Sequence, residues 1–77
     1  NEQIIIRVRI YPELENNCLP ENLKLAILSD SGETLKEVTS RSIDNFIQLP
    51  SFRCSYQESF KLQLSINNIC CTESFFL

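Results

Sequence analysis

The chain contains no histidine, methionine or tryptophan, and only one of its 77 residues is a glycine. Without histidine, the chain lacks the Ser-His and Cys-His pairs that many enzymes use for nucleophilic catalysis. A single glycine is too few for a glycine-rich phosphate-binding loop. No apolar run approaches the ~20 residues of a membrane-spanning helix. The composition therefore argues against an enzyme and against a membrane protein.

The chain does not begin with methionine and does not have the layered composition of a signal peptide. We therefore expect a fragment of a longer protein that forms one domain over residues 1–77. A domain of this size buries only ~60% of the surface of its unfolded chain, so its stability should be modest unless a neighbour covers it.

Seven basic and ten acidic residues leave a net charge of −3. Proteins that bind nucleic acid usually concentrate basic side chains in a stripe that neutralises phosphates, whereas the basic residues here are scattered along the sequence. Nucleic acid and anionic membranes are therefore disfavoured as partners. The acidic pairs Glu13 with Glu15 and Glu33 with Glu37 are best explained as solvated charges rather than as acid–base catalysts.

Four cysteines, Cys18, Cys54, Cys70 and Cys71, would permit two disulfides. Adjacent residues on a strand point to opposite faces, so Cys70 and Cys71 would each need a separate partner. The paired spacing of zinc ligands is absent. We expect buried free thiols that act as small apolar residues, with one disulfide as the alternative, and no metal or cofactor.

Apolar and polar residues alternate along several short segments, which is the pattern of half-buried β-strands. The segments with this pattern, or with a related apolar composition, are 4–11, 23–28, 34–41, 46–49, 60–66 and 69–77. Gly32 lies in the polar stretch 29–33 and suits a hairpin turn, because glycine adopts positive φ without steric cost. The sequence predicts an all-β fold, a small antiparallel β-sandwich of Ig-like or Greek-key type with six or seven strands; a small barrel is the alternative.

Three segments are harder to assign. Leu35 and Val38 are three residues apart, so both face the core only if a β-bulge separates them, and a short amphipathic helix is the competing interpretation. Residues 53–58 are expected to form a polar turn anchored by Tyr56. The last strand is expected to bend at residues 72–74, which would give the seventh strand.

Arg7 and Arg9 are the candidate functional residues, together with Tyr11. They share one face of the first predicted strand with Ile5, because side chains alternate between the two faces of a strand. This face is a possible docking surface for an acidic protein or a neighbouring domain. The alternative is an ordinary solvent face, on which arginine discourages pairing with other strands.

Three aromatic side chains, Tyr11, Phe46 and Tyr56, form the second candidate site. Exposed aromatic rings could stack on the rings of a carbohydrate, although the absence of tryptophan weakens this idea. Anchoring of the core or of turns is the simpler explanation for the same residues.

Motifs along most of the chain resemble the C-terminal part of a cyanobacterial family known as domain of unknown function 1822. The matching stretches are Ile-Arg-Val-Arg-Ile-Tyr-Pro (6–12), Leu-Pro-Glu-Asn-Leu-Lys-Leu (19–25), the segment 27–38, Arg-Ser-Ile-Asp-Asn-Phe-Ile-Gln-Leu-Pro (41–50), the segment 57–66 and Cys-Thr-Glu-Ser-Phe (71–75). The family usually has tryptophan in place of Phe46 and glycine in place of Gln57. The resemblance implies a cyanobacterial source and a longer chain, with no assigned activity and no catalytic residues.

Together these observations predict a non-catalytic β-sandwich that serves as a protein-interaction or structural module in the cytoplasm. Its partner would be another protein or the rest of its own chain, and its oligomeric state is left open. A carbohydrate-binding module is the alternative function.

Overall fold

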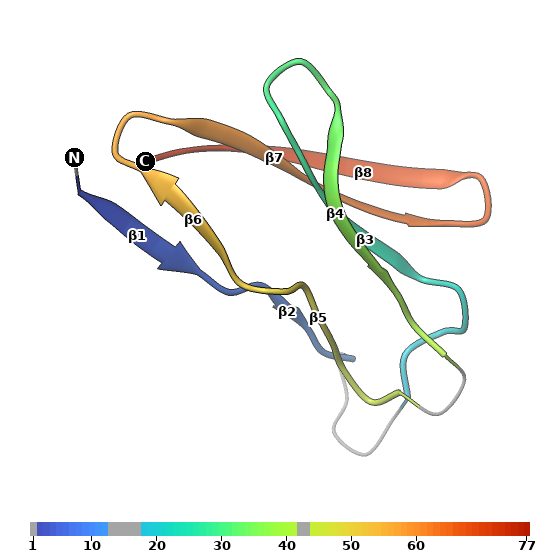
Figure 1. The fold of residues 1–77 in the computed structure, drawn as a ribbon. Coiled ribbons are helices and arrows are strands. Elements are labelled where there is room, and N and C mark those ends of the chain that lie inside the picture. The colour runs from blue at the N-terminus through green and yellow to red at the C-terminus, as the bar shows by residue number, and fades with distance from the viewer. Residues whose placement is uncertain (1, 13–17, 42–43) are drawn as a thin grey trace.

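Eight β-strands form two layers in the computed structural model, which describes residues 2–12, 18–41 and 44–77 (Figure 1). The strands are β1 (Gln3–Ile6), β2 (Arg9–Ile10), β3 (Lys24–Leu28), β4 (Thr34–Thr39), β5 (Ile47–Gln48), β6 (Phe52–Ser55), β7 (Ser59–Ile66) and β8 (Ile69–Phe76). One layer is an antiparallel sheet in the order β4-β3-β7-β8. The other is a narrow ribbon, in which β1 pairs with β6 and β2 with β5, also antiparallel. The all-β sandwich expected from the sequence is confirmed.

The hairpin of β3 and β4 turns at Gly32, whose φ is +92°. Its register shifts between Ile27 and Leu28 and skips Leu35, so a β-bulge is present, but at Leu35 rather than between Leu35 and Val38 as expected. Val38 packs against the core, whereas Leu35 stays 56% exposed. The strand interpretation is therefore confirmed, the helix alternative is wrong, and only one of the two apolar residues faces the core.

The first predicted strand becomes β1 and β2, separated by Arg7 and Val8. Its even-numbered apolar residues are half-buried and its odd-numbered residues are exposed, as the alternation predicts. The opposite segment contains one extra residue near Pro50 and Ser51. This extra residue changes which side chains face the core. Before it the odd-numbered Ile47 and Leu49 face the core, and after it the even-numbered Phe52 and Cys54 do.

Strand β6 corrects the prediction of a polar turn over residues 53–58. Residues 53–55 belong to this strand, which pairs with β1 far away in sequence. Their polar composition indicated a turn. The strand was not recognised because β1, which pairs with it, is remote in sequence and leaves no local signal. Only Tyr56 and Gln57 form the turn itself, and Gln57 has a φ of +72°.

The core lies between the two layers and is made by side chains from both. Its buried members are Leu19, Leu23, Leu25, Ile27, Ile47, Leu49, Cys54 and Phe60. Leu25 comes from the sheet and Leu49 from the ribbon, and they are 2% and 0% exposed. Across the edge of the layers, Lys36 Nζ donates a hydrogen bond to the carbonyl of Ser51 (3.1 Å).

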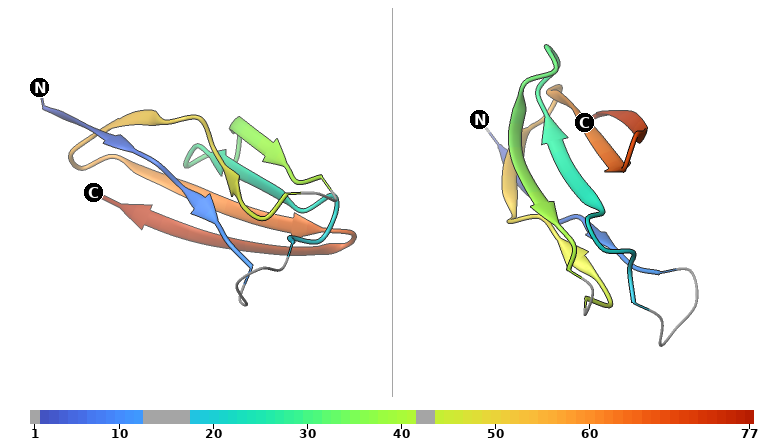
Figure 2. Two further views of the ribbon diagram at one scale, coloured as in Figure 1. Left: turned by 90° about the horizontal axis from the view of Figure 1, so that it is seen from below. Right: turned by 90° about the vertical axis from the view of Figure 1, so that its right-hand side faces the viewer.

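Strand β8 runs unbroken along β7 for eight paired residues, so the predicted bend at residues 72–74 is wrong. The two strands meet in a tight turn at Asn67, which has a φ of +54°. Every residue of β8 is exposed, because the narrow ribbon does not extend over it (Figure 2).

The cysteines also differ from the expectation. All four are free thiols, but only Cys54 is buried, and Cys18, Cys70 and Cys71 are exposed. The prediction that the other three are buried is wrong. Two of them lie on the uncovered strand β8, and the third lies in the connection before Leu19.

Within the described residues, no helix has the length and apolar composition that crossing a membrane would require.

Candidate functional site

The outer face of the ribbon, which points away from the core, carries the candidate residues. We define it by the exposed or half-buried side chains Gln3, Ile5, Arg7, Arg9, Tyr11, Phe46, Gln48, Arg53 and Ser55. Directly paired residues of antiparallel strands share a face, and the register pairs Gln3 with Ser55, Ile5 with Arg53 and Arg9 with Gln48. Residues from two distant parts of the sequence, 3–11 and 46–55, therefore form one continuous surface.

The charge of the outer face is of one sign. It contains Arg7, Arg9 and Arg53, and no acidic residue of the described ranges 2–12, 18–41 and 44–77 is among its members. The protein as a whole is acidic, with a net charge of −3. The fold therefore concentrates positive charge that looks scattered in the sequence.

Arg9 is the centre of a small cluster at the β2–β5 end of the outer face. Its Nε donates a hydrogen bond to Oε1 of Gln48 (2.5 Å), and its Nη1 lies 3.4 Å from the hydroxyl of Tyr11. The rings of Tyr11 and Phe46 stack with centroids 5.5 Å apart and an interplanar angle of 22°. The guanidinium carbon of Arg9 lies 5.9 Å from the centroid of the Phe46 ring.

The core-facing residues of β2 and β5 determine how this cluster is positioned. Ile10 and Ile47 pair across β2 and β5 and point towards the core, which turns their neighbours Tyr11 and Phe46 outward. The backbone N–H of Leu49 donates to the carbonyl of Val8 (3.1 Å) and continues the pairing beyond β5. The cluster is therefore anchored by a well-packed ribbon.

The cluster presents chemistry suited to a carboxylate or another planar acceptor. A guanidinium has five N–H donors, and the contacts to Gln48 and Tyr11 use two of them. The remaining donors lie on its terminal nitrogens, where two parallel N–H groups bind a carboxylate well. Tyr11 and Phe46 are 59% and 44% exposed, so apolar contact area lies beside these donors.

All three candidate residues lie on the outer face, as the alternation predicted. Arg9 and Tyr11 are in contact, whereas Arg7 lies in the break between β1 and β2 and is exposed. Sequence reasoning missed Arg53, because it assigned this residue to a turn. The alternation of Phe52 and Cys54 with Arg53 and Ser55 was the signal that could have identified the strand.

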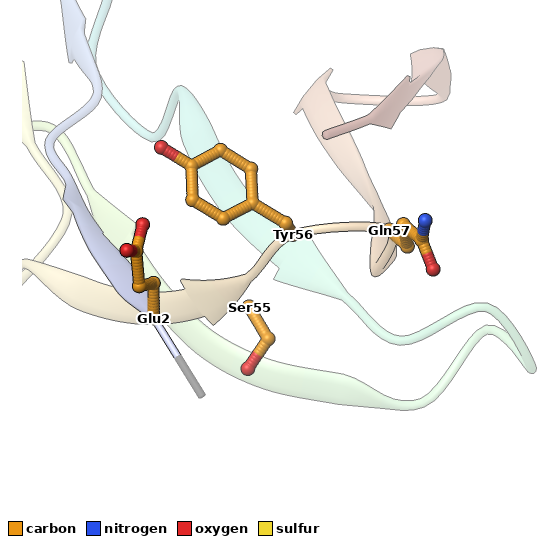
Figure 3. A pocket seen from close by; sticks show the side chains of 4 residues that line it. All are labelled: Glu2, Ser55, Tyr56 and Gln57. Atoms are coloured by element: carbon orange, nitrogen blue, oxygen red, sulfur yellow. The ribbon is translucent and has the colours of Figure 1, made fainter.

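Tyr56 lies elsewhere. It follows β6 at the end of the ribbon where β1 begins, whereas Tyr11 follows β2 at the opposite end. Tyr56 is 56% exposed and lines a shallow pocket of about 330 Å³ with Glu2, Ser55 and Gln57 (Figure 3). The expected anchoring by Tyr56 is wrong, and the three aromatic residues do not form one platform.

The remaining titratable groups have structural surroundings. Asp44 accepts hydrogen bonds from the backbone N–H of Arg41 (2.8 Å) and from its guanidinium (3.1 Å), and both lower the pKa of its carboxyl. Glu33 and Glu37 are exposed, while Glu13 and Glu15 lie outside the described residues. Within the part of the chain that the structure describes, no three Cys, Asp or Glu side chains gather as a metal site would require.

Residues 1–76 match a family described as "Protein of unknown function (DUF1822)". The chain belongs to this family. The resemblance seen in the motifs is therefore confirmed at the level of the family. No curated protein and no solved structure matches this DUF1822 chain at a significant level.

Proposed function

We propose that the chain is a non-catalytic β-sandwich module that binds an acidic surface of another protein, or of the rest of its own chain, through the outer face of the ribbon. The observation that carries the proposal is that this face of an acidic protein has three arginines and no acidic member among the residues that the structure describes. Arginine and tyrosine are also the residue types that contribute most binding energy at protein interfaces.

The Arg9 cluster supports the same proposal by its geometry. The stacked rings and Gln48 hold the guanidinium in one orientation, so little side-chain freedom is lost on binding. A protein carboxylate that reaches Arg9 would also contact the exposed edge of Tyr11. Nucleic acid fits less well, because the net negative charge of the protein opposes a polyphosphate partner.

The experiment is capture of partners from extract of the source cells with the purified chain as bait, compared with an Arg7→Glu, Arg9→Glu double variant. A partner bound by the wild type and lost by the variant is expected. The matched control is Lys24→Glu, Lys61→Glu, which changes the net charge equally on the other layer. Equal loss in both variants would reveal a nonspecific charge effect and contradict the proposal, as would binding that neither variant changes.

A carbohydrate-binding module is the second candidate function. It draws support from the exposed stack of Tyr11 and Phe46 beside the polar groups of Arg9 and Gln48. The site would consist of these residues, since Tyr56 lies at the other end of the ribbon. Glycan-array binding that Tyr11→Ala abolishes and Tyr56→Ala leaves intact would favour it over the protein-binding proposal.

The wider setting is also part of the proposal. We propose that the chain is the C-terminal part of a longer cyanobacterial protein and resides in the cytoplasm. The resemblance of the motifs supports the first statement. Four free cysteines, three of them exposed, support the second, because the cytosol keeps thiols reduced. Alkylation of the thiols in intact source cells would show them reduced, and disulfides found there would contradict a cytoplasmic location.

A further inference from the structure

Strand β8 has an edge that pairs with no other strand of the described chain, and we infer that this edge pairs with β8 of a second copy to form an antiparallel dimer. β8 is the last strand of the four-stranded sheet and is bonded on one side only, to β7 (Figure 2). Unpaired backbone groups on an exposed edge favour pairing with another strand.

The edges of this sandwich differ in how well they are protected. The edge strand β4 carries Lys36 and a register shift. The β1–β2 edge is broken and carries Arg7 and Arg9, and the β5–β6 edge has Pro50 and Arg53. Lysine, proline, bulges and interruptions are the devices by which natural sheets discourage edge pairing.

β8 shows none of these devices. Its eight residues contain no proline, no lysine, no arginine and no glycine, and their register with β7 is regular throughout. Ile69 and Phe76 are 71% and 73% exposed, and Glu73 is the only charged residue. An edge that is long, regular and apolar is a predicted site of association.

The backbone groups available on β8 follow from its pairing with β7. Ile66 and Ile69 pair around the two-residue turn, and the N–H of Leu77 donates to the carbonyl of Glu58 (3.1 Å). Hydrogen-bonded positions alternate in an antiparallel pair, so the odd-numbered residues of β8 bond towards β7. The N–H and C=O groups that point to the free edge are those of Cys70, Thr72, Ser74 and Phe76.

These outward groups allow few symmetric registers. A two-fold axis at Thr72 pairs Thr72 with its own copy and Cys70 with Ser74 of the second copy, which forms about six hydrogen bonds. An axis at Glu73 would place two like charges directly opposite, which is destabilising. An axis at Cys71 would leave Phe75 and Phe76 unpaired. Electrostatics therefore disfavours the axis at Glu73 and overlap disfavours the axis at Cys71, which leaves the axis at Thr72.

An apolar groove beside β8 fits the same occupant. It has a volume of about 210 Å³ and is lined mainly by apolar side chains of the ribbon, β7 and β8, among them Val8, Ile10, Leu64 and Phe75. In the register centred on Thr72, Ile69 of the second copy lies opposite Phe75 on the face that borders this groove. The second copy therefore supplies apolar side chains where the narrow ribbon ends.

The length of the edge sets the expected strength. Eight residues at ~3.4 Å each give an edge about 27 Å long, so a contact strip ~10 Å high covers about 270 Å² of each copy. Stable interfaces bury about 800 Å² per partner, which makes this dimer weak and dependent on concentration.

The test is sedimentation equilibrium of the chain in reducing buffer from ~5 to ~500 µM, a range chosen because small interfaces bind weakly. The average mass of the wild type should rise towards that of a dimer. Thr72→Pro should remain monomeric, because it removes an N–H that points to the free edge and is not used in pairing with β7. Thr72→Lys serves the same purpose if the proline variant has a lowered melting temperature.

The matched control is Thr34→Lys, which adds the same charge to the edge strand β4 of the same sheet, opposite Leu28, and should dimerise like the wild type. A wild type that is monomeric at every concentration would overturn the inference, and so would a dimer that survives both Thr72 variants. The outcome is independent of the outer face of the ribbon, which none of these variants changes.

Cross-linking tests the register. In a background of Cys18→Ser, Cys70→Ser and Cys71→Ser, Thr72→Cys should form a disulfide-linked dimer under mild oxidation, because directly opposed residues lie within reach of a disulfide. Glu73→Cys should cross-link much less. The reverse result would place the axis at Glu73 and overturn the proposed register.

Discussion

The four cysteine side chains lie in two kinds of surroundings. Cys54 is part of β6 in the ribbon, faces the core and is 5% exposed, whereas Cys18, Cys70 and Cys71 are exposed. Burial raises the pKa of the Cys54 thiol, and the nearby negative charge of Glu58 raises it further. The thiolate is the reactive form, so this thiol has both a smaller reactive fraction and less access to reagents.

We predict that a thiol reagent modifies three cysteines rapidly in the native protein and Cys54 only on unfolding. The measurement is the time course of labelling at neutral pH with and without denaturant, with peptide mapping to assign the sites. Cys54→Ala is the control, and it should lose only the slow phase. Rapid labelling of Cys54 in native buffer would show that the four-stranded sheet does not cover it.

A buried hydroxyl illustrates how one polar side chain fixes a connection. Ser40 is 2% exposed, accepts a hydrogen bond from the backbone N–H of Leu23 (2.9 Å) and donates one to the carbonyl of Pro20 (2.5 Å). It thereby satisfies two backbone groups where the chain enters β3. Sequence reasoning gave no role to this serine, because both of its partners are remote in sequence.

Among the elements, β7 contributes an aromatic residue that contacts the ribbon. Phe60 is 7% exposed and lies between two other rings. The ring of Phe52 meets it edge-on from the ribbon and the ring of Phe75 stacks on it from β8, each with centroids 5.4 Å apart. Leu62 lies on the same face of β7 but is only half-buried and borders the open groove.

We therefore predict that Phe60→Ala lowers the free energy of unfolding by about 3–5 kcal/mol, because it leaves a cavity among three packed rings. Leu62→Ala, the matched control on the same strand, should cost only about 1–2 kcal/mol, since part of its side chain is already in solvent. Urea denaturation of both variants measures the difference. Equal losses would mean that the groove is closed in solution.

At the scale of the whole molecule, the ribbon covers only part of the four-stranded sheet. The ribbon is two segments wide and the sheet is four strands wide, so β8 is left outside the sandwich (Figure 1). β3 has the opposite situation, because it is flanked by β4 and β7 and its residues from Leu25 to Leu28 are all buried. Local stability should follow this distribution.

We predict that the amide protons of Leu25 to Leu28 exchange most slowly with solvent and that those of Thr72 and Ser74 exchange at least about 100-fold faster in the monomer. Hydrogen exchange followed by nuclear magnetic resonance at low protein concentration measures both sets. Protection of Thr72 that appears only at high concentration would independently support pairing of β8. Slow exchange at Thr72 in the dilute protein would contradict the exposed edge.

The sequence by itself determined the strand class, the Gly32 hairpin and the outward face of Arg7, Arg9 and Tyr11. These features depend on local conformational preference and on alternation along one strand, which neighbouring residues specify. The spacing of Leu35 and Val38 indicated an irregularity in the β3–β4 hairpin but not its position, because the register shift lies at Leu35 and leaves this residue exposed.

Only the tertiary structure decided which strands are covered and which residues meet. Arg53 joins the outer face because β6 pairs with β1, and β8 stays exposed, together with Cys70 and Cys71, because the ribbon ends before reaching it. Alternation shows that a strand has an apolar face but not whether another layer exists to cover it. Cover depends on pairing between segments far apart in the chain. The same long-range pairing places β8 last in the sheet and leaves its edge free to bind a second copy.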